Sequence, residues 1–162
     1  MSISTTVRMA TGSDLAYVVE QQRRWSNALG FLPRVAHTRY IDANRVLIAM
    51  HNGQRAGYAN MIISAKGLLR LPQIAIDHEL LRIGIGSALM HALINIGNSH
   101  GSDAIRLTSR ADLHANDFWP TTGFYVTLTT RPNNARQQPL LEWTRQLARP
   151  SQRSIKSDKR SL

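Results

Sequence analysis

Two glycines separated by a single residue, Gly84 and Gly86, place the tightest constraint on how this chain folds. They lie between an apolar segment that ends near Asp77 and a stretch, residues 87–99, whose apolar residues repeat at helical spacing. A strand that runs through such a loop into a helix brings the free N–H groups of the first helical turn to the loop. Glycine lets the backbone approach a ligand closely, and a helix N-terminus carries about half a positive charge. The loop at residues 81–87 therefore predicts a site for a phosphorylated ligand.

Two common nucleotide-binding motifs do not fit this loop. A Rossmann fingerprint needs a third glycine and a β-α-β unit around it, and a P-loop needs Gly-Lys followed by Ser or Thr. Arg82 and the Ser87 hydroxyl add hydrogen-bond donors, and each bond to a charged group contributes roughly 1.5–3 kcal/mol. On its own, the glycine pair leaves an ordinary structural turn open as the alternative.

The remaining pattern predicts an α+β fold with a mixed sheet and helices on its faces. Hairpin-linked strands come first, around an Asn52-Gly53 turn, and one β-α-β unit follows. Pro72 falls inside a predicted strand and indicates an edge or a bulge there. The predicted helices cover residues 15–25, 34–43, 87–99 and 112–121, and the predicted strands 7–10, 46–50, 57–64, 68–77, 104–109, 125–130 and 139–143.

Composition excludes several kinds of chemistry. The sequence has no cysteine, which rules out disulfides, thiolate nucleophiles and an acyl-cysteine intermediate. A hydrophobic content of 43% with 19% charged residues is ordinary for one globular domain, and no apolar run approaches the ~18 residues that span a bilayer. The first ten residues lack the apolar region of a signal peptide, so we expect a cytoplasmic protein without a membrane partner.

Positive charge is concentrated toward the C-terminus. The net charge is +10, which indicates an anionic partner. From Arg145 onward the sequence has six basic residues and one acidic residue, Asp158. We expect residues 1–148 to form the domain and residues 149–162 to be a disordered basic tail. A solvated tail and a nucleic-acid contact both stay open. The second is weakened because the tail has no aromatic residue that could stack on a base.

Several motifs together resemble the GNAT acyltransferase superfamily. Residues 74–77 (IAID) followed by Leu81-x-x-Gly84-x-Gly86 resemble its pyrophosphate motif, and residues 112–124 (DLHANDFWPTTGF) resemble its second cofactor motif. Residues 8–14 resemble its usual opening, and residues 52–57 its central hairpin. The order and spacing of these motifs also match.

The resemblance implies the GNAT fold, a mixed and mostly antiparallel sheet of about seven strands flanked by about four helices. It implies acetyl-CoA or another acyl-CoA as co-substrate, no metal, and direct attack of an amine on the thioester in a ternary complex. Direct transfer agrees with the absence of cysteine. By the same resemblance, the cofactor would be held by the backbone of Ile74 and Ile76, by the loop residues Arg82, Ile83, Gly84, Ile85, Gly86 and Ser87, and by Asp112, Asn116 and Trp119 at the thiol end.

Some positions depart from the family pattern. Leu81 stands where Gln or Arg is usual, although Arg82 beside it can compensate. Trp119 stands where many members carry the tyrosine that protonates the leaving thiolate, and an indole N–H donates a hydrogen bond but is no acid near neutral pH. This Phe-Trp pair resembles a subgroup of small bacterial and phage-associated members. The glutamates that serve other members as bases are replaced here by Leu107 and Arg70.

Asp77 is the candidate catalytic residue that remains. A carboxylate at the end of the pyrophosphate strand can act as a base through water. Helix capping or an ion pair with Arg82 is the alternative. His78, His37 and Tyr40 are weaker candidates for the base or the acceptor side, against plain surface or packing roles.

The energetics of deprotonation bear on the acceptor. A lysine side chain with a pKa of about 10.4 needs roughly 4–5 kcal/mol to lose its proton at pH 7, and an α-amine near 7.7 needs about 1. We therefore expect an acetyl-CoA-dependent N-acyltransferase acting on a small-molecule amine or an α-amine. Two alternatives stay open, a CoA-binding regulator without activity and a nucleic-acid-binding protein that uses the basic tail. A homodimer is also left open.

Overall fold

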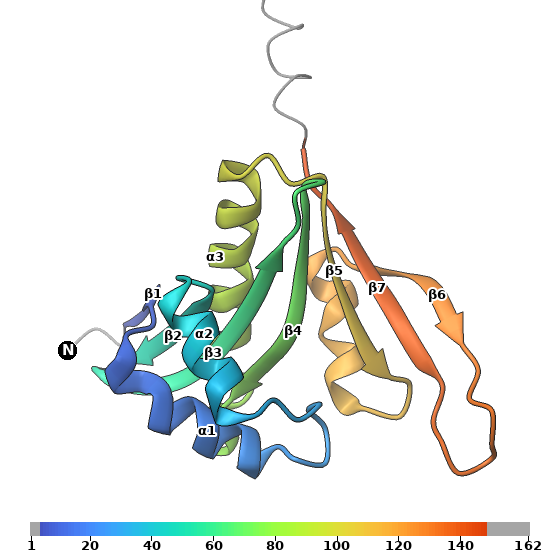
Figure 1. The fold of residues 1–162 in the computed structure, drawn as a ribbon, viewed down its shortest axis with the longest axis horizontal. Helices are drawn as coiled ribbons and strands as arrows, with labels where there is room; N and C mark the ends of the chain where they lie inside the picture. Colours follow the sequence, from blue (N-terminus) through green and yellow to red (C-terminus); the bar gives the residue numbers. More distant parts are fainter. Residues whose placement is uncertain (1–3, 149–162) are drawn as a thin grey trace, which may run out of the picture. The chain divides into compact units, whose positions relative to one another are not determined.

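The computed structural model describes residues 4–148, so the predicted basic tail at 149–162 lies outside the described residues. The predicted α+β class is confirmed. Seven strands form a sheet in the order β1-β2-β3-β4-β5-β7-β6 (Figure 1). The β4–β5 pairing is parallel, whereas β1–β2, β2–β3, β5–β7 and β6–β7 are antiparallel.

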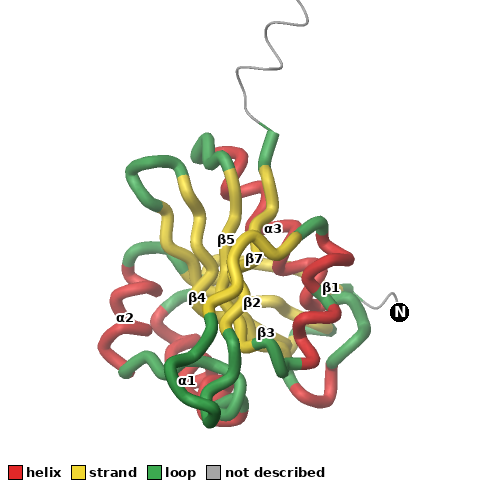
Figure 2. Tube along the Cα trace, turned by 90° about the vertical axis from the view of Figure 1, so that its right-hand side faces the viewer, coloured by secondary structure: helices red, strands yellow, loops and turns green. Residues whose placement is uncertain are grey.

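The elements follow the predicted order closely. The strands are β1 (Thr5–Met9), β2 (Val46–His51), β3 (Gln54–Ile63), β4 (Leu68–Ile76), β5 (Ala104–Arg110), β6 (Tyr125–Thr130) and β7 (Leu140–Gln146). The α-helices are α1 (Leu15–Arg24), α2 (Arg34–Asp42) and α3 (Ile85–Ser99), and short 3-10 helices cover Gly12–Asp14, His78–Leu80, His114–Asp117 and Trp119–Thr122. Figure 2 distinguishes the helices, strands and loops by colour.

The chain divides into two compact units. Among the described residues, unit 1 comprises residues 4–62 together with 71–92, and unit 2 comprises residues 63–70 and 93–148. In unit 1 the β2–β3 turn has Asn52 at φ 50° and Gly53 at φ 77°, the two left-handed residues that a tight hairpin requires. Helices α1 and α2 lie beside each other in this unit (Figure 1).

The core of unit 1 joins these helices to the sheet. It is built from buried residues of α1, α2 and strands β2 to β4: Val18, Ile41, Val46, Ile48, Tyr58 and Ala75. Fully burying one such side chain contributes roughly 1.5–3 kcal/mol. The apolar residues of α1 therefore repeat at helical spacing because that spacing places them against this core.

A buried carboxylate fixes the start of unit 1. Asp14 is fully buried, and its oxygens accept hydrogen bonds from the Arg8 guanidinium at 2.7 and 2.9 Å, from Arg55 Nε at 2.7 Å and from the Thr11 backbone N–H at 2.8 Å. The bond from Arg8 holds the pKa of Asp14 well below its usual range, although burial acts in the opposite direction. This cluster ties β1, the first turn and β3 together.

A second polar network pins the α1–α2 loop to β4. The Gln22 side-chain carbonyl accepts hydrogen bonds from the Leu32 N–H and from Gln73 Nε2, both at 2.8 Å, and Gln73 Nε2 also donates to the Gly30 carbonyl at 2.5 Å. His37 lies buried beside Gln22, with Nε2 3.1 Å from the same oxygen, and burial lowers its pKa. Because that oxygen only accepts, His37 carries its proton on Nε2 and packs inside the network.

Two details of the prediction are corrected by the structure. Pro72 lies within β4, which has a neighbour on each side in the sheet order, so this strand is not at an edge of the sheet. The parallel pairing of β4 with β5 covers Leu68–Arg70, so that ladder needs no N–H at position 72. In unit 2, the predicted single helix at 112–121 is two 3-10 helices, because Pro120 cannot occupy a helix interior and Gly123, at φ 85°, ends the second one.

Candidate active site

The loop between β4 and α3 has an unusual backbone. Arg82 has φ 65° and Gly84 has φ 95°, both in the left-handed region. A Cβ added at Gly84 would meet no atom within 4 Å, so glycine is required there by the backbone angle and not by crowding. A non-glycine residue such as Arg82 is held in this region at a cost of about 1 kcal/mol, and such residues concentrate at ligand sites.

The start of α3 directs donors at this loop. The helix begins at Ile85, and its first backbone bond runs from the Ala88 N–H to the Gly84 carbonyl at 3.0 Å. The N–H groups of residues 85–87 therefore precede the first helical bond. Ile85 is buried and anchors the turn, whereas the Arg82 and Ser87 side chains are exposed. This arrangement fits a pyrophosphate, which can accept from these amides and from the Arg82 guanidinium.

One edge of β4 is open beside the loop. Gln73 and Asp77 direct their N–H groups toward β3, to Asn60 Oδ1 at 2.7 Å and to the Ala56 carbonyl at 2.9 Å. Since successive backbone groups along a strand alternate in direction, Ile74 and Ile76 face the opposite edge. The β5 ladder on that side covers Leu68–Arg70 and does not use them. These two residues can pair with the amides of an extended ligand.

Trp25 reaches the same edge of β4. Its indole Nε1 donates to the Ile76 carbonyl at 2.8 Å, and its ring stacks on His78 with centroids 3.8 Å apart. The Ile76 carbonyl therefore already has one donor, which leaves the Ile76 N–H and both backbone groups of Ile74 for a ligand. His78 lies exposed on the outside of this stack.

Asp77 lies half-buried against α1. Its Oδ1 accepts hydrogen bonds from the Tyr17 hydroxyl at 2.9 Å and from Gln21 Nε2 at 2.5 Å. Among residues 4–148 the contacts of this carboxylate with other side chains all fall on Oδ1, and an ion pair with Arg82 is not formed. Both donors are neutral, and Oδ2 has no side-chain partner among residues 4–148.

Tyr17 and Gln21 are site residues that the sequence reading missed. They lie one turn apart on α1, so both reach Asp77 from the same face. Burial, followed by the hydrogen bond to Asp77, raises the pKa of Tyr17, so its hydroxyl remains a donor. Gln21 is buried, and its Oε1 has no partner among the described residues. The i, i+4 spacing of polar residues on the inner face of α1 was the available signal.

The predicted cofactor residues of unit 2 differ in how their side chains are used. Asp112 pairs with Arg110, with Nε to Oδ1 at 3.1 Å and Nη2 to Oδ2 at 3.3 Å. Asn116 accepts from the Ser109 hydroxyl at 2.6 Å and donates to the Arg110 carbonyl at 2.8 Å. Its carboxamide therefore braces the segment after β5.

Trp119 is the least expected residue of this unit. It is 4% exposed, and its ring makes edge contacts with Phe118 and Phe124. Its indole N–H is buried and has no hydrogen-bond partner within the described part of the chain. A buried unpaired donor costs roughly 1–3 kcal/mol, so this N–H is suited to a ligand acceptor.

The sequence also matches a family model, described as an acetyltransferase (GNAT) domain, over residues 17–137. This chain belongs to the GNAT acetyltransferase family. The resemblance seen in the sequence motifs is confirmed, and the protein is a GNAT-type acyltransferase. A search of the curated proteins found no match.

Solved GNAT structures share the fold at low sequence identity. Ard1 from Thermoplasma volcanium superposes with a TM-score of 0.78 at 18% identity, covering 89% of this chain and 98% of that one. The ribosomal-protein-S18-alanine N-acetyltransferase from Escherichia coli gives 0.76 at 19% identity, covering 90% and 95%. YncA from Salmonella typhimurium, a putative acetyltransferase solved with acetyl-CoA, gives 0.76 at 18% identity, also covering 90% and 95%. At these identities the likeness establishes the GNAT fold.

Among residues 4–148, no helix has the length and apolar character to cross a membrane. Within the same range, no three His, Asp or Glu side chains converge as metal ligands would.

Proposed function

We propose that this GNAT protein transfers an acetyl group from acetyl-CoA directly to a primary amine within a ternary complex. The observation that carries the proposal is the continuous run from Ile74 to Ser87. It combines an open strand edge, a left-handed loop and the unpaired amides of a helix N-terminus. Along this run, backbone groups that can pair with an amide-containing chain are followed by N–H groups that can bind an anion. An extended acyl-CoA presents its pantetheine arm and its pyrophosphate in the same order.

Each part of the run has a role in the proposal. The backbone groups of Ile74 and Ile76 pair with the pantetheine arm, and the amides of residues 82–87 hold the pyrophosphate together with the Arg82 and Ser87 side chains. Asp112, Asn116 and Trp119 flank the thiol end, where the unpaired indole N–H of Trp119 supports such a contact. Bound acetyl-CoA supplies an activated thioester.

Asp77 is the proposed base. In the reaction the amine nitrogen forms a bond to the acyl carbon, the carbon–sulfur bond breaks so that CoA leaves as its thiolate with the electron pair, and the nitrogen loses a proton. Asp77 Oδ2 accepts that proton through a water molecule, while Tyr17 and Gln21 hold Oδ1. General-base help of this kind contributes about 10²–10⁴-fold, which is enough for an α-amine or another low-pKa amine.

The experiment for the proposal is thiol release from acetyl-CoA with a panel of acceptors. The panel contains small primary amines, α-amino peptides and the same peptides with acetylated N-termini. We expect turnover with one of the free-amine classes and none with the acetylated peptides. Release that does not depend on an amine would point to hydrolysis and would contradict the proposal.

The left-handed backbone of Arg82 leads to opposite predictions for stability and for CoA affinity when this residue is replaced by glycine. Replacing Arg82 by glycine relieves the backbone cost, so the free energy of unfolding should rise by about 0.5–1 kcal/mol. The same change removes the guanidinium, so the dissociation constant for CoA should rise about tenfold. Urea unfolding and calorimetric titration of CoA measure the two effects. Stability and affinity that fall together would show that Arg82 is a structural residue.

Gly84 can be tested against a matched glycine. Gly84 and Gly101 both have positive φ, at 95° and 68°, and an added Cβ meets nothing within 4 Å at either site. Alanine at either position should cost about 1 kcal/mol of stability through backbone strain. Only Gly84→Ala should weaken CoA binding, by at least about tenfold, since only that loop carries the phosphate site. Equal CoA affinities for the two variants would show that the Gly84 loop does not bind CoA.

A further inference from the structure

The loop between β6 and β7, residues 131–139, surrounds two adjoining hollows of unit 2. Both are shallow and open to solvent, with volumes of about 690 and 820 Å³. Arg131, Asn133 and Gln137 line both. These three residues are outside the set that is proposed to hold the cofactor, although one member of that set, Asp112, also lines the larger hollow.

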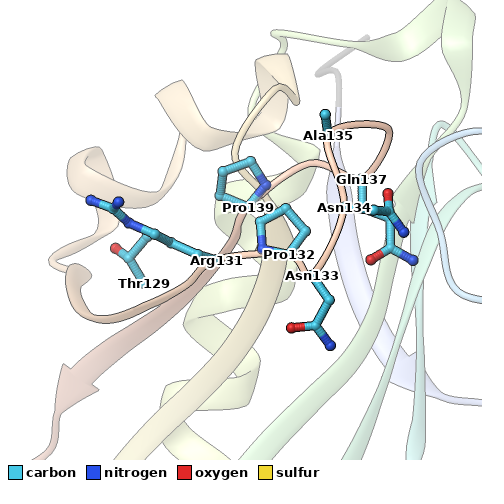
Figure 3. A pocket seen from close by; sticks show the side chains of 8 residues that line it. All are labelled: Thr129, Arg131, Pro132, Asn133, Asn134, Ala135, Gln137 and Pro139. Carbon is cyan, nitrogen blue, oxygen red and sulfur yellow. The ribbon is translucent and has the colours of Figure 1, made fainter.

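The loop has a defined shape. Figure 3 shows the rings of Pro132 and Pro139 between Arg131 on one side and the carboxamides of Asn134 and Gln137 on the other. The Asn134 side chain accepts from the Arg136 N–H at 3.0 Å, and the proline at each end restricts the backbone. The polar side chains are therefore presented on a turn that is closed locally.

The charge around these hollows is positive on balance, because three arginines and one acid, Asp112, line the larger one. Arg110 lines the larger hollow, but its guanidinium already faces Asp112. Arg131 and Arg136 have no ion pair among the described residues. The sequence supplies no acid from position 118 to position 141. Two unpaired guanidiniums match one phosphate monoester, which carries about −1.5 to −2 charges, or two backbone phosphates of a nucleic acid.

The other lining groups narrow the ligand further. Asn133, Gln137 and Gln138 offer both donors and acceptors, the groups that contact sugars and base edges. No aromatic side chain lines either hollow, so base stacking does not contribute. A ligand held here is recognised by its phosphate first, and by polar edges second.

We propose that the β6–β7 loop is a binding site for a phosphate group carried by a nucleotide or an RNA strand, with Arg131 and Arg136 as the paired cations. This site is distinct from the predicted basic tail, and its occupancy does not depend on acetyl transfer.

The test uses the full chain without acyl-CoA and a fluorescein-labelled 12-nucleotide single-stranded RNA, followed by fluorescence anisotropy over a KCl series. The double variant Arg131→Gln/Arg136→Gln should weaken binding at least tenfold. It should also lower the slope of log K against log salt by about 1.4, because each phosphate contact on a single strand contributes about 0.7. The matched control is Arg34→Gln/Arg39→Gln on α2, which removes the same charge from two exposed arginines elsewhere. It should change binding less than threefold.

Equal losses for the two double variants would reduce the effect to overall charge and overturn the proposal, as would no loss in the loop variant. Inorganic phosphate, AMP and adenosine, added at constant ionic strength, identify the source of the phosphate. Displacement by phosphate and AMP alike assigns the site to a phosphate group, and displacement by AMP at tenfold lower concentration assigns it to a nucleotide. Displacement by adenosine at the same concentration as AMP would contradict phosphate recognition.

Discussion

Replacing Asp77 by asparagine is expected to lower kcat at least about 100-fold while the dissociation constant for CoA changes less than twofold. The reason is that asparagine keeps the size and the acceptor oxygen that Tyr17 and Gln21 contact, but it cannot take a proton. Steady-state kinetics with the best acceptor and calorimetry with CoA measure the two quantities. The fold should be retained, which thermal unfolding checks on the same samples.

Two controls separate catalysis from packing around Asp77. Tyr17→Phe removes one of the two donors to Oδ1 and leaves the carboxylate, so kcat should fall less than tenfold. Asp42→Asn removes an exposed carboxylate from α2 and should have no effect. Wild-type turnover in the Asp77→Asn protein would exclude Asp77 as the base. The reaction would then proceed by positioning of the reactants, which alone accounts for large rate enhancements in oriented systems.

Replacing Asp14 by alanine should lower the free energy of unfolding of unit 1 by about 3 kcal/mol, since it removes a buried acceptor shared by Arg8, Arg55 and the Thr11 N–H. The pH dependence follows from the lowered pKa of Asp14. A depressed folded-state pKa contributes stability that is fully present above the unfolded-state value of about 3.9 and is lost as the pH falls below it. Urea unfolding between pH 6 and pH 2.5 measures this. The wild-type stability should fall more steeply with acid than that of Asp14→Ala.

The control for Asp14 is an ion pair on the surface. Glu20 and Arg23 form an exposed pair on α1 with N–O at 2.6 Å, and Glu20→Ala should change stability little because water solvates both partners. If the curves of stability against pH for wild type and Asp14→Ala run parallel, the bonds from the arginines do not lower the pKa of the Asp14 carboxylate. A loss at neutral pH as small as that of Glu20→Ala would lead to the same conclusion.

The fold could be predicted from the sequence because its signals are local. The Asn52-Gly53 pair specified a hairpin through its two left-handed residues, and the apolar spacing of residues 87–99 specified α3. The prediction differed from the structure where a segment distant in the sequence determines the local arrangement. Pro72 indicated an edge because a sequence does not reveal that the β5 ladder ends at Arg70.

The candidate site could be predicted only in part for the same reason. The glycines of the loop located the phosphate site, but the left-handed angle of Arg82 depends on how the strand meets the helix and has no signature in the residue type. Asp77 stood out as a carboxylate at a strand end. Its partners Tyr17 and Gln21 lie some sixty residues earlier in the chain, and only folding brings them to it.

The run Ile74–Ser87 is proposed to hold an acyl-CoA, and backbone amide NMR of the ¹⁵N-labelled protein titrated with CoA tests this most directly. We expect the largest chemical-shift changes at the amides of Ile74, Ile76 and residues 82–87, with those of β1 and β2 unchanged. Saturable changes that leave these amides unaffected, or no change at millimolar CoA, would contradict it.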